Sequence, residues 1–449
     1  MRLLNHKRYT TSRRRHGCLL LVLLVTMLLL PGRPVLAQDP NTITVNRTED
    51  FVDAAPGNGL CDADPNDKVL QCTLRAAIME ANALPGAQTI LLPSGNYRLT
   101  IPGQNEDGSR TGDLDITGDL TISGRGETQP MIDGGAMDRV MHIVKSENTQ
   151  AALENVTIRN GSVPFSAGGG IIVESASHLS ITDSALIDNV ANNGGALQFG
   201  RDAEVTLLRV RVQNNFAKDM GGGITANGRA TIRASIISGN RAGQPNVPNK
   251  GRGGGIMAGG DGDKPIVIEQ STIAGNTATL IGGGIGSVLI DTKLTLINST
   301  VSGNSAPSAA GIQIEEPIVL QHTTVTGNDG TGIRVGDPNA TVVLLNSIIA
   351  DNTAPACDLA SPTILLKGER NLISDSSCPF VAPAANLLNT NPLLGPLQLN
   401  DGTTPTHALL PGSPAIDGAN HAFCTPVDQR GVLRPQGAGC DIGAFEATP

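Results

Sequence analysis

The sequence predicts an all-β fold in which short strands stack as the coils of a parallel β-helix, and two observations support this prediction. The first is a repeat of 24 to 28 residues that runs through the middle of the chain. The second is the composition of the 449 residues, which include 54 Gly but only 7 Phe, 2 Tyr and no Trp. So few aromatic side chains cannot fill an ordinary globular core, so the interior must be aliphatic and must tolerate much glycine.

Seven copies of the repeat align without gaps. Each has an aliphatic residue at its third and eighth positions and Asn at its eleventh, and the sixth is Ser or Thr in every copy except the one with Val210. Short β-branched runs separated by Gly and Asn are typical of strands, so each repeat is predicted to form one coil of two or three strands. The copies are residues 179–189, 205–215, 230–240, 266–276, 294–304, 318–328 and 342–352.

In a stack of such coils, equivalent positions lie about 4.8 Å apart in columns. The aliphatic positions then form the core, and the side-chain amide of each Asn can bond to the Asn of the next coil. Glycine runs between the copies supply the bends. We expect about ten coils in a β-helix of residues 112–380, with an Asn ladder made of Asn189, Asn215, Asn240, Asn276, Asn304, Asn328 and Asn352.

With its GGGI runs and its recurring Asn, this segment resembles right-handed parallel β-helix proteins, and in particular the repeats of polymorphic outer-membrane and extracellular proteins. The resemblance implies a right-handed solenoid that presents a long repetitive surface outside the cell.

The first 37 residues have the pattern of an export signal. A basic stretch that ends at Arg15 precedes an apolar run from Cys18 to Leu30, and Val35-Leu36-Ala37 is a cleavage site. The apolar run is too short to span a bilayer, and no second one follows, so we expect no transmembrane segment in the mature chain. We therefore expect a secreted or cell-surface protein that is cleaved near Ala37.

The chain after residue 37 is strongly acidic. Residues 1–37 hold seven of the 32 Lys and Arg residues and no Asp or Glu. The rest of the chain therefore has 25 basic and 41 acidic residues, a net charge of 25 − 41 = −16. Nucleic acid binding needs a concentrated basic surface, so we expect no nucleic acid partner. We expect a monomer whose partners are polysaccharides or components of the cell envelope or matrix.

Six cysteines remain after the predicted cleavage, and they fall into three pairs that are close in sequence. Six cysteines allow 15 connectivities, and pairing between neighbours is the simplest for an exported protein. The predicted disulfides are Cys61–Cys72, Cys357–Cys378 and Cys424–Cys440.

Residues 38–111 are predicted to form a cap over the first coil, because open strand edges invite aggregation. Thr73 is a helix N-cap, a helix of about ten residues follows, Pro85-Gly86 ends it, and residues 89–92 are a strand. The stretch resembles the CSLREA domain of bacterial surface β-helices, although Cys72-Thr73-Leu74-Arg75-Ala76-Ala77 differs from that motif at two positions. Ala76 removes the Glu of a capping box.

Residues 381–449 break the period and are predicted to form a small cap with a disulfide. Residues 412–446 resemble the choice-of-anchor Q domain, but only three residues follow, so no sorting tail is expected. The charged side chains of this segment suggest either a ligand site or ion pairs within the cap, and we favour the ion pairs. They are Asp428, Arg430, Arg434, Asp441 and Glu446.

Two regions are candidates for ligand binding. An insertion in the longest repeat carries Arg241, Lys250 and Arg252, followed by Asp261 and Asp263, and insertions in solenoids often mark the binding face. At the start of the coils, Asp113, Asp115 and Asp119 could bind Ca²⁺, although alternating Asp also describes an outward strand face. No other cofactor is predicted.

The coils offer only three Phe residues, Phe165, Phe199 and Phe216, and Phe199 is expected to point inward. The outward positions after the glycine runs contain no row of carboxylates. These positions are Ile172, Gln198, Thr225, Met257, Gly286, Gln313 and Arg334. The sequence therefore predicts a non-catalytic protein of adhesion, matrix or carbohydrate contact. The alternative is a polysaccharide lyase or glycoside hydrolase acting on an acidic polysaccharide, which needs several carboxylates and a basic residue in one groove.

Overall fold

The computed structural model describes residues 41–66, 69–104, 106–144, 149–259, 264–287, 293–315, 317–381 and 385–448. The chain divides into two units, Met1–Asp39 and Pro40–Pro449, and only the second is described. The predicted export signal lies outside the described residues. Within them, no helix combines the length and hydrophobicity that a membrane crossing requires.

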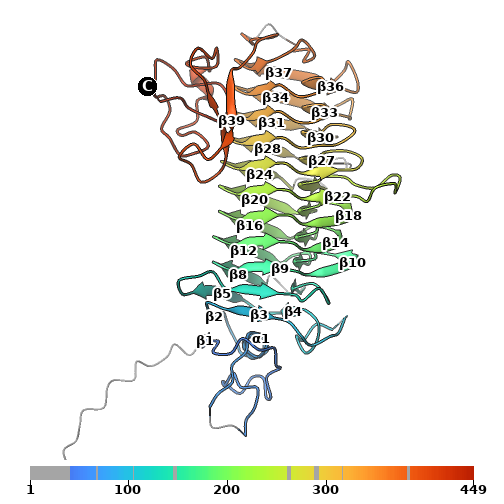
Figure 1. Cartoon of the computed structure of the whole chain (residues 1–449), viewed down its shortest axis with the longest axis vertical. Helices are drawn as coiled ribbons and strands as arrows, with labels where there is room; N and C mark the ends of the chain where they lie inside the picture. The colour runs from blue at the N-terminus through green and yellow to red at the C-terminus, as the bar shows by residue number, and fades with distance from the viewer. Residues whose placement is uncertain are drawn as a thin grey trace, which may run out of the picture. The chain divides into compact units, whose positions relative to one another are not determined.

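The second unit is a right-handed parallel β-helix built from three long parallel sheets and one short one (Figure 1). The twelve-stranded sheet contains β1 (Thr42–Thr44), β2 (Gln88–Pro93), β5 (Leu120–Arg125), β8 (Gln150–Glu154), β12 (His178–Thr182), β16 (Glu204–Leu208), β20 (Arg229–Arg233), β24 (Ile266–Glu269), β28 (Leu294–Ile297), β31 (Ile318–Gln321), β34 (Thr341–Leu345) and β37 (Leu365–Glu369).

The eleven-stranded sheet follows it around each coil. It contains β3 (Asn96–Arg98), β6 (Met131–Asp133), β9 (Thr157–Arg159), β13 (Ala185–Ile187), β17 (Arg211–Gln213), β21 (Ile236–Ser238), β25 (Thr272–Ala274), β29 (Thr300–Ser302), β32 (Thr324–Thr326), β35 (Ile348–Ala350) and β38 (Leu372–Ile373).

The other two parallel sheets complete the coil. The five-stranded sheet contains β10 (Ser162–Ala167), β14 (Val190–Asn193), β18 (Phe216–Met220), β22 (Arg241–Ala242) and β26 (Thr277–Ala278). The ten-stranded sheet contains β4 (Leu114–Ile116), β7 (Met141–Ile143), β11 (Ile171–Val173), β15 (Leu197–Phe199), β19 (Ile224–Ala226), β23 (Ile256–Ala258), β27 (Ile285–Ser287), β30 (Ile312–Ile314), β33 (Ile333–Val335) and β36 (Cys357–Leu359).

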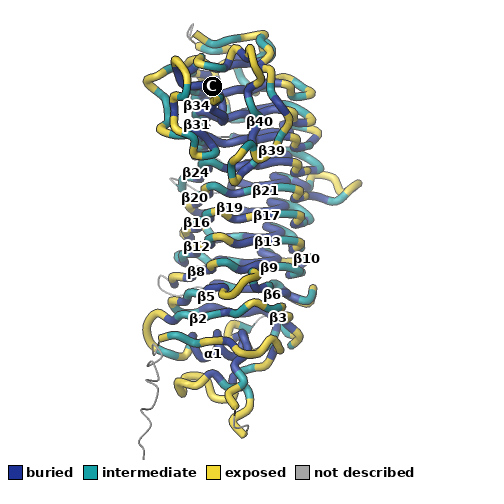
Figure 2. The backbone as a smooth tube through the Cα atoms, turned by 60° about the vertical axis from the view of Figure 1, so that its left-hand side comes forward, coloured by how far each residue is buried: buried dark blue, intermediate teal, exposed yellow. Residues whose placement is uncertain are grey.

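Each eleven-residue copy spans the first two strands of a coil, and each of these coils has three or four strands, where two or three were predicted. Ile181, the third position of one copy, pairs with Leu207 of the next and is fully buried, and Leu186, the eighth position, pairs with Val212. One continuous aliphatic core runs through the stack, and Figure 2 shows its buried strands along the column. Phe199 points into this core and is 1% exposed.

The Asn residues of the repeats form a single hydrogen-bonded ladder. From Asn189 to Asn328, each backbone N–H donates to Oδ1 of the next Asn at 2.9–3.1 Å, and each side-chain amide donates to the same oxygen at 2.9–3.0 Å. Asn352 receives the last of these bonds. The ladder therefore satisfies buried backbone groups at every corner it occupies.

The glycine runs allow the backbones of successive coils to approach closely before each strand of the ten-stranded sheet. The N–H of Gly222 donates to the carbonyl of Gly253 at 3.0 Å, and a Cβ on Gly222 would lie 2.3 Å from the carbonyl oxygen of Gly254. Only glycine fits at such a contact.

The predicted helix forms as α1 (Leu74–Ala83), and its first turn is capped by the Thr73 hydroxyl, which accepts from the N–H of Ala76 at 3.1 Å. Arg75 is fully buried: its Nε lies 2.6 Å from Asp50, and it donates to the carbonyls of Ser109 and Gly112. Strands β1, β2 and β3 also join the long sheets, so the coils begin before residue 112, the predicted boundary. The first coil, which these strands form, lacks the Asn at the eleventh position and the glycine run that mark the repeat, so the sequence pattern did not reveal it.

From residue 394 onward, the C-terminal segment is held by Cys424–Cys440, as predicted, but this part lies beside the last coils and does not close the end of the column (Figures 1 and 2). It contains the antiparallel pair β39 (Leu394–Gln398) and β40 (Thr406–Leu409) and a short 3-10 helix, His421–Phe423. Gln429 bonds to the Thr272 and Thr300 hydroxyls, and Ile442 packs with Ile348. The outer face of the eleven-stranded sheet supplies these hydroxyl and aliphatic partners.

The end of the column is covered by the segment that follows β38. Phe380 packs against the main core, and the Asn386 side chain accepts hydrogen bonds from Asn371. The disulfide Cys357–Cys378 ties this segment to β36, and Cys61–Cys72 lies in the N-terminal cap.

Candidate functional site

The middle residue of each strand in the ten-stranded sheet points outward, and these residues form one column along the molecule. Strand pairing places the predicted outward positions from Ile172 to Arg334 in one column, although Thr225, Met257 and Gln313 are buried. It adds Asp115 and His142 before them and Asp358 after them. Ionisable groups therefore lie at both ends of this column, with Asp115 and His142 near the N-terminal cap and Arg334 and Asp358 at the other end.

Both outward-facing Phe residues of the coils lie on the five-stranded sheet. Phe165 on β10 is 92% exposed, and the Lys218 Nζ lies 4.2 Å from the centre of its ring. Phe216 on β18 pairs in register with Arg241 on β22, whose guanidinium carbon lies 5.9 Å from the ring centre. Each ring therefore has a cation at its face, within the range of a cation–π interaction.

The predicted basic insertion is only partly free of internal partners. Lys250 Nζ lies 3.1 Å from Asp219 Oδ2, and Arg252 lies 3.9 Å from the other oxygen of the same carboxylate. Arg241, by contrast, is exposed beside Phe216. Asp261 and Asp263, predicted to join this region, lie outside the described residues.

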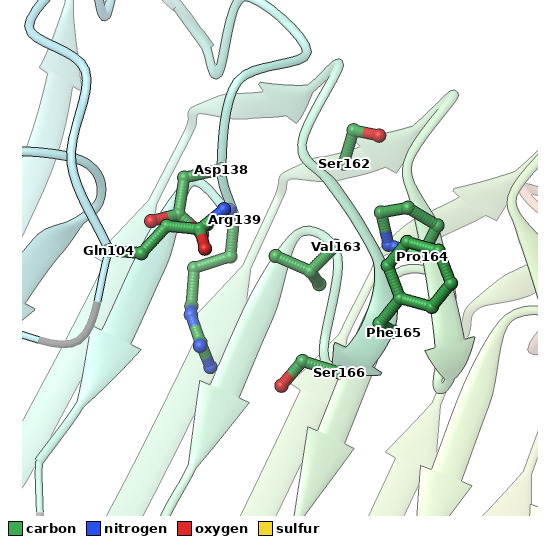
Figure 3. A pocket seen from close by; sticks show the side chains of 8 residues that line it. All are labelled: Gln104, Asp138, Arg139, Ser162, Val163, Pro164, Phe165 and Ser166. Carbon is green, nitrogen blue, oxygen red and sulfur yellow. Dashed lines mark hydrogen bonds between the residues drawn. The ribbon is translucent and has the colours of Figure 1, made fainter.

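A pocket of about 150 Å³ lies beside Phe165. Figure 3 shows Arg139, Asp138 and Gln104 on one side of it and Pro164 and Phe165 on the other, with Val163 between them. Ser162 and Ser166 complete the lining. The pocket thus combines an aromatic ring, an aliphatic floor and a guanidinium group, which is a suitable set for a sugar that carries an acidic group.

Buried carboxyl groups surround the Arg139 side of the pocket. Arg139 Nε lies 2.6 Å from Asp113 Oδ2, and both side chains are largely buried. Burial raises the pKa of Asp113 to about 7, against the opposing charge of Arg139 and with a further contribution from Asp115. Burial also raises the pKa of Asp138. Perturbed carboxyl groups beside a pocket are a mark of functional sites.

Next to this group, Asp107, Asp115 and His142 place one potential ligand atom each within 4.8 Å of the others. His142 Nδ1 lies 3.3 Å from Asp115 and 3.7 Å from Asp107, and Nε2 lies 3.3 Å from Glu174. Burial alone lowers the pKa of His142, but its contact with the Asp115 carboxylate and the charges of Asp113 and Asp115 raise this pKa above its usual value.

The three Asp residues predicted to bind Ca²⁺ have different environments. Asp115 belongs to the group with His142, whereas Asp113 is paired with Arg139. Asp119 is exposed at the next corner, where its carboxylate accepts the N–H of Gln150 at 2.9 Å. The prediction missed Asp107 and His142, although His142 follows Asp115 by one repeat length and so could have been found by extending the repeat toward the N-terminus.

The charged residues of the C-terminal segment form internal ion pairs. Arg434 lies 2.7 Å from Glu446, both side chains are fully buried, and Arg430 lies 2.8 Å from Asp428. Asp441 accepts the N–H groups of Asp417 and Ala447. These side chains stabilise the segment, in agreement with the interpretation favoured from the sequence.

Comparison with known proteins bears mainly on the fold. A family model described as "Right handed beta helix region" matches residues 223–382. A crystal structure of pectate lyase Pel9A superposes with a TM-score of 0.40 and 12% sequence identity, covering 91% of this chain and 97% of that one. No curated protein matches the chain.

Proposed function

We propose that the protein binds an acidic polysaccharide, without catalysis, on the face formed by the five-stranded sheet and the adjoining pocket. The observation that carries the proposal is a pair of outward-facing Phe rings, Phe165 exposed and Phe216 partly exposed, each with a cation at its face, on a single sheet of an otherwise acidic molecule. We call this surface the cation–aromatic face and define it by Arg139, Phe165, Phe216, Lys218 and Arg241.

The chemistry of a uronic acid suits this face. The apolar side of a sugar ring stacks on an aromatic ring, while its carboxylate forms charge-assisted hydrogen bonds with Lys or Arg. Phe165 is almost fully exposed, so a sugar can reach its ring even with Lys218 nearby. The rings lie on β10 and β18, which are separated by β14, so they are at least two strand spacings, roughly 9.6 Å, apart, and one polysaccharide chain could contact both through sugars that are not adjacent.

An enzyme is the second candidate, and the buried carboxyl groups favour it. Asp113, Asp115 and Asp138 converge with Arg139 beside the pocket, which is the arrangement expected of a lyase or hydrolase in this fold. We favour binding because the carboxyl groups are nearly covered, which leaves them poorly placed to reach a sugar.

One experiment separates the two candidates. The purified protein is applied to an array of acidic and neutral glycans, and the glycans that bind are tested for new reducing ends and for absorbance at 235 nm. We expect salt-sensitive binding to acidic glycans with no turnover. Turnover that disappears in Asp113→Asn would favour the enzyme, and binding to neutral glycans alone would contradict both candidates.

We further propose that the protein acts as a monomer outside the cytoplasm, with its CSLREA-like and choice-of-anchor Q-like segments flanking the coils. The pattern of residues 1–37 and the three disulfides support this proposal, since disulfides persist in oxidising compartments. Sequencing the N-terminus of the protein recovered from the culture medium and cell surface tests it. Cleavage near Ala37 is expected, and an intact N-terminus on protein confined to the cytoplasm would contradict it.

A further inference from the structure

Asp107, Asp115 and His142 come from three separate parts of the chain and meet at the junction between the cap and the first coils. Asp115 is the outward residue of β4, His142 is its neighbour in register on β7, and Asp107 lies in the loop that leads to β4. The Asp107 side chain is 67% exposed, so the group can be reached from solvent.

Asp115 is held in a way that leaves one oxygen available. Its side chain is fully buried, and the N–H of Ser109 donates to Oδ2 at 2.7 Å. Oδ1 is buried without a hydrogen bond of its own and faces His142 Nδ1 at 3.3 Å. A buried carboxylate oxygen without a hydrogen bond is costly unless another positive group or an ion compensates it.

The two distances from His142 Nδ1 match the spacing of ligand atoms in a metal coordination shell, and all three potential ligand atoms lie within 4.8 Å of one another. Ligand atoms about 2.0–2.1 Å from a tetrahedral ion lie about 3.4 Å apart, and the two distances from His142 Nδ1 are 3.3 and 3.7 Å. The second nitrogen of His142 lies 3.3 Å from the Glu174 carboxylate. A carboxylate in that position commonly orients a metal-binding imidazole.

We propose that Asp107, Asp115 and His142 bind a divalent transition metal ion of the zinc type. An imidazole with two carboxylates suits zinc and its neighbours better than calcium, which prefers a shell of six or more oxygens. The ion links the loop that carries Asp107 to the first two coils and so holds the N-terminal cap on the column. The site is independent of the polysaccharide proposal.

The test is calorimetric titration of the EDTA-treated full chain with ZnCl₂, with CaCl₂ titrated in parallel. We expect one zinc ion per chain with a dissociation constant below about 10 μM and a loss of at least about tenfold in Asp107→Asn and His142→Gln. Because Asp107 is largely exposed, Asp107→Asn keeps the test informative if His142→Gln fails to fold. Asp119→Asn is the matched control and should bind like the wild type.

Three results would overturn the assignment. They are the absence of stoichiometric zinc binding by the folded chain, equal zinc affinity in the wild type and Asp107→Asn, and tighter binding of calcium than of zinc. A loss of binding in Asp119→Asn that equals the loss in Asp107→Asn would also contradict it, because it would assign the ion to a different set of carboxylates.

Discussion

At the scale of single residues, His322 shows how a side chain of the coils can become part of the contact with the C-terminal segment. It occupies the corner between β31 and β32, where its backbone has a positive φ of 46°. Its ring lies within hydrogen-bond distance of the carbonyls of Asp441 and Phe423 and of the Asn346 amide. Burial and, to a lesser extent, the positive charge of Arg434 lower the pKa of His322 to about 3.

This burial predicts a pH-dependent contribution to stability. The pKa of an unfolded His is about 6.5, so the stability from neutral His322 is complete above that pH. As the pH falls from about 6.5 toward 3, the contribution of His322 to the free energy of unfolding decreases by up to about 1.4 kcal/mol per pH unit. In denaturant unfolding at pH 8, 6 and 5, His322→Gln should be less stable than the wild type at pH 8, and this difference should shrink on acidification. The exposed His421→Gln is the control, and a constant difference for His322→Gln would contradict the prediction.

The cation–aromatic face also depends on single residues, since each ring has one cation. Lys218→Ala should weaken binding of an acidic glycan by about three- to tenfold, in line with a cation–π or ion-pair contribution of about 0.5–1 kcal/mol or slightly more. Surface plasmon resonance at two salt concentrations measures this effect. Lys367→Ala, an exposed Lys on β37, is the matched control, and equal losses in both variants would show that only net charge matters.

At the scale of elements, the Asn ladder makes each corner depend on its neighbours. Asn276 accepts from both the N–H and the amide of Asn240, and it donates to Asn304 and to the carbonyl of Ile237. Removing its side chain leaves several buried groups without partners. In a solenoid, each coil is stabilised largely by its interfaces with the neighbouring coils, so the loss of these hydrogen bonds lowers the stability of the stack.

Asn276→Ala is therefore expected to reduce the free energy of unfolding by about 2–4 kcal/mol, because two or more buried polar groups lose their partners. Urea unfolding followed by circular dichroism measures the change. Asn96→Ala, at an exposed position of β3, is the control and should change it by less than about 0.5 kcal/mol. A loss in Asn276→Ala as small as in the control would mean that the ladder does not stabilise the stack.

At this scale, some features could be predicted from the sequence and others could not. The aliphatic and Asn positions repeat, so the coils, the ladder and the α1 boundaries followed from periodicity and capping. The group of Asp107, Asp115 and His142 was not predicted. Extending the repeat toward the N-terminus would have aligned His142 with Asp115, but Asp107 lies in a loop without a period and could not have been found in this way. The position of the C-terminal segment was likewise not predictable, since Gln429 and Thr300 are 129 residues apart and belong to no common pattern.

At the scale of the whole molecule, the C-terminal segment fastens several coils together from the side. Gln429 bonds to Thr272, Thr300 and Thr404, and Ala444 bonds to Thr324, so one short segment joins β25, β29 and β32. Coils that precede β24 have no comparable cover on this face in the described chain. The two halves of the column should therefore differ in local stability.

Gln429→Ala tests this difference. Amide hydrogen exchange should increase at β25, β29, β39 and β40, because the variant leaves buried hydroxyl groups without partners. Exchange at β13 and β17, which lie outside the contact, should stay unchanged. A uniform increase along the column would contradict the idea that the segment protects only the coils it touches.

The most direct measurement of the proposed function is the affinity of the full chain for polygalacturonate, compared between wild type and the double variant Phe165→Ala/Phe216→Ala. Phe51→Ala, an equally simple truncation of a half-exposed ring in the N-terminal cap, is the control. Loss of two stacking rings should weaken binding by at least about tenfold, and the control should bind like the wild type. Equal affinity in all three proteins would contradict the assignment of this face as a polysaccharide-binding surface.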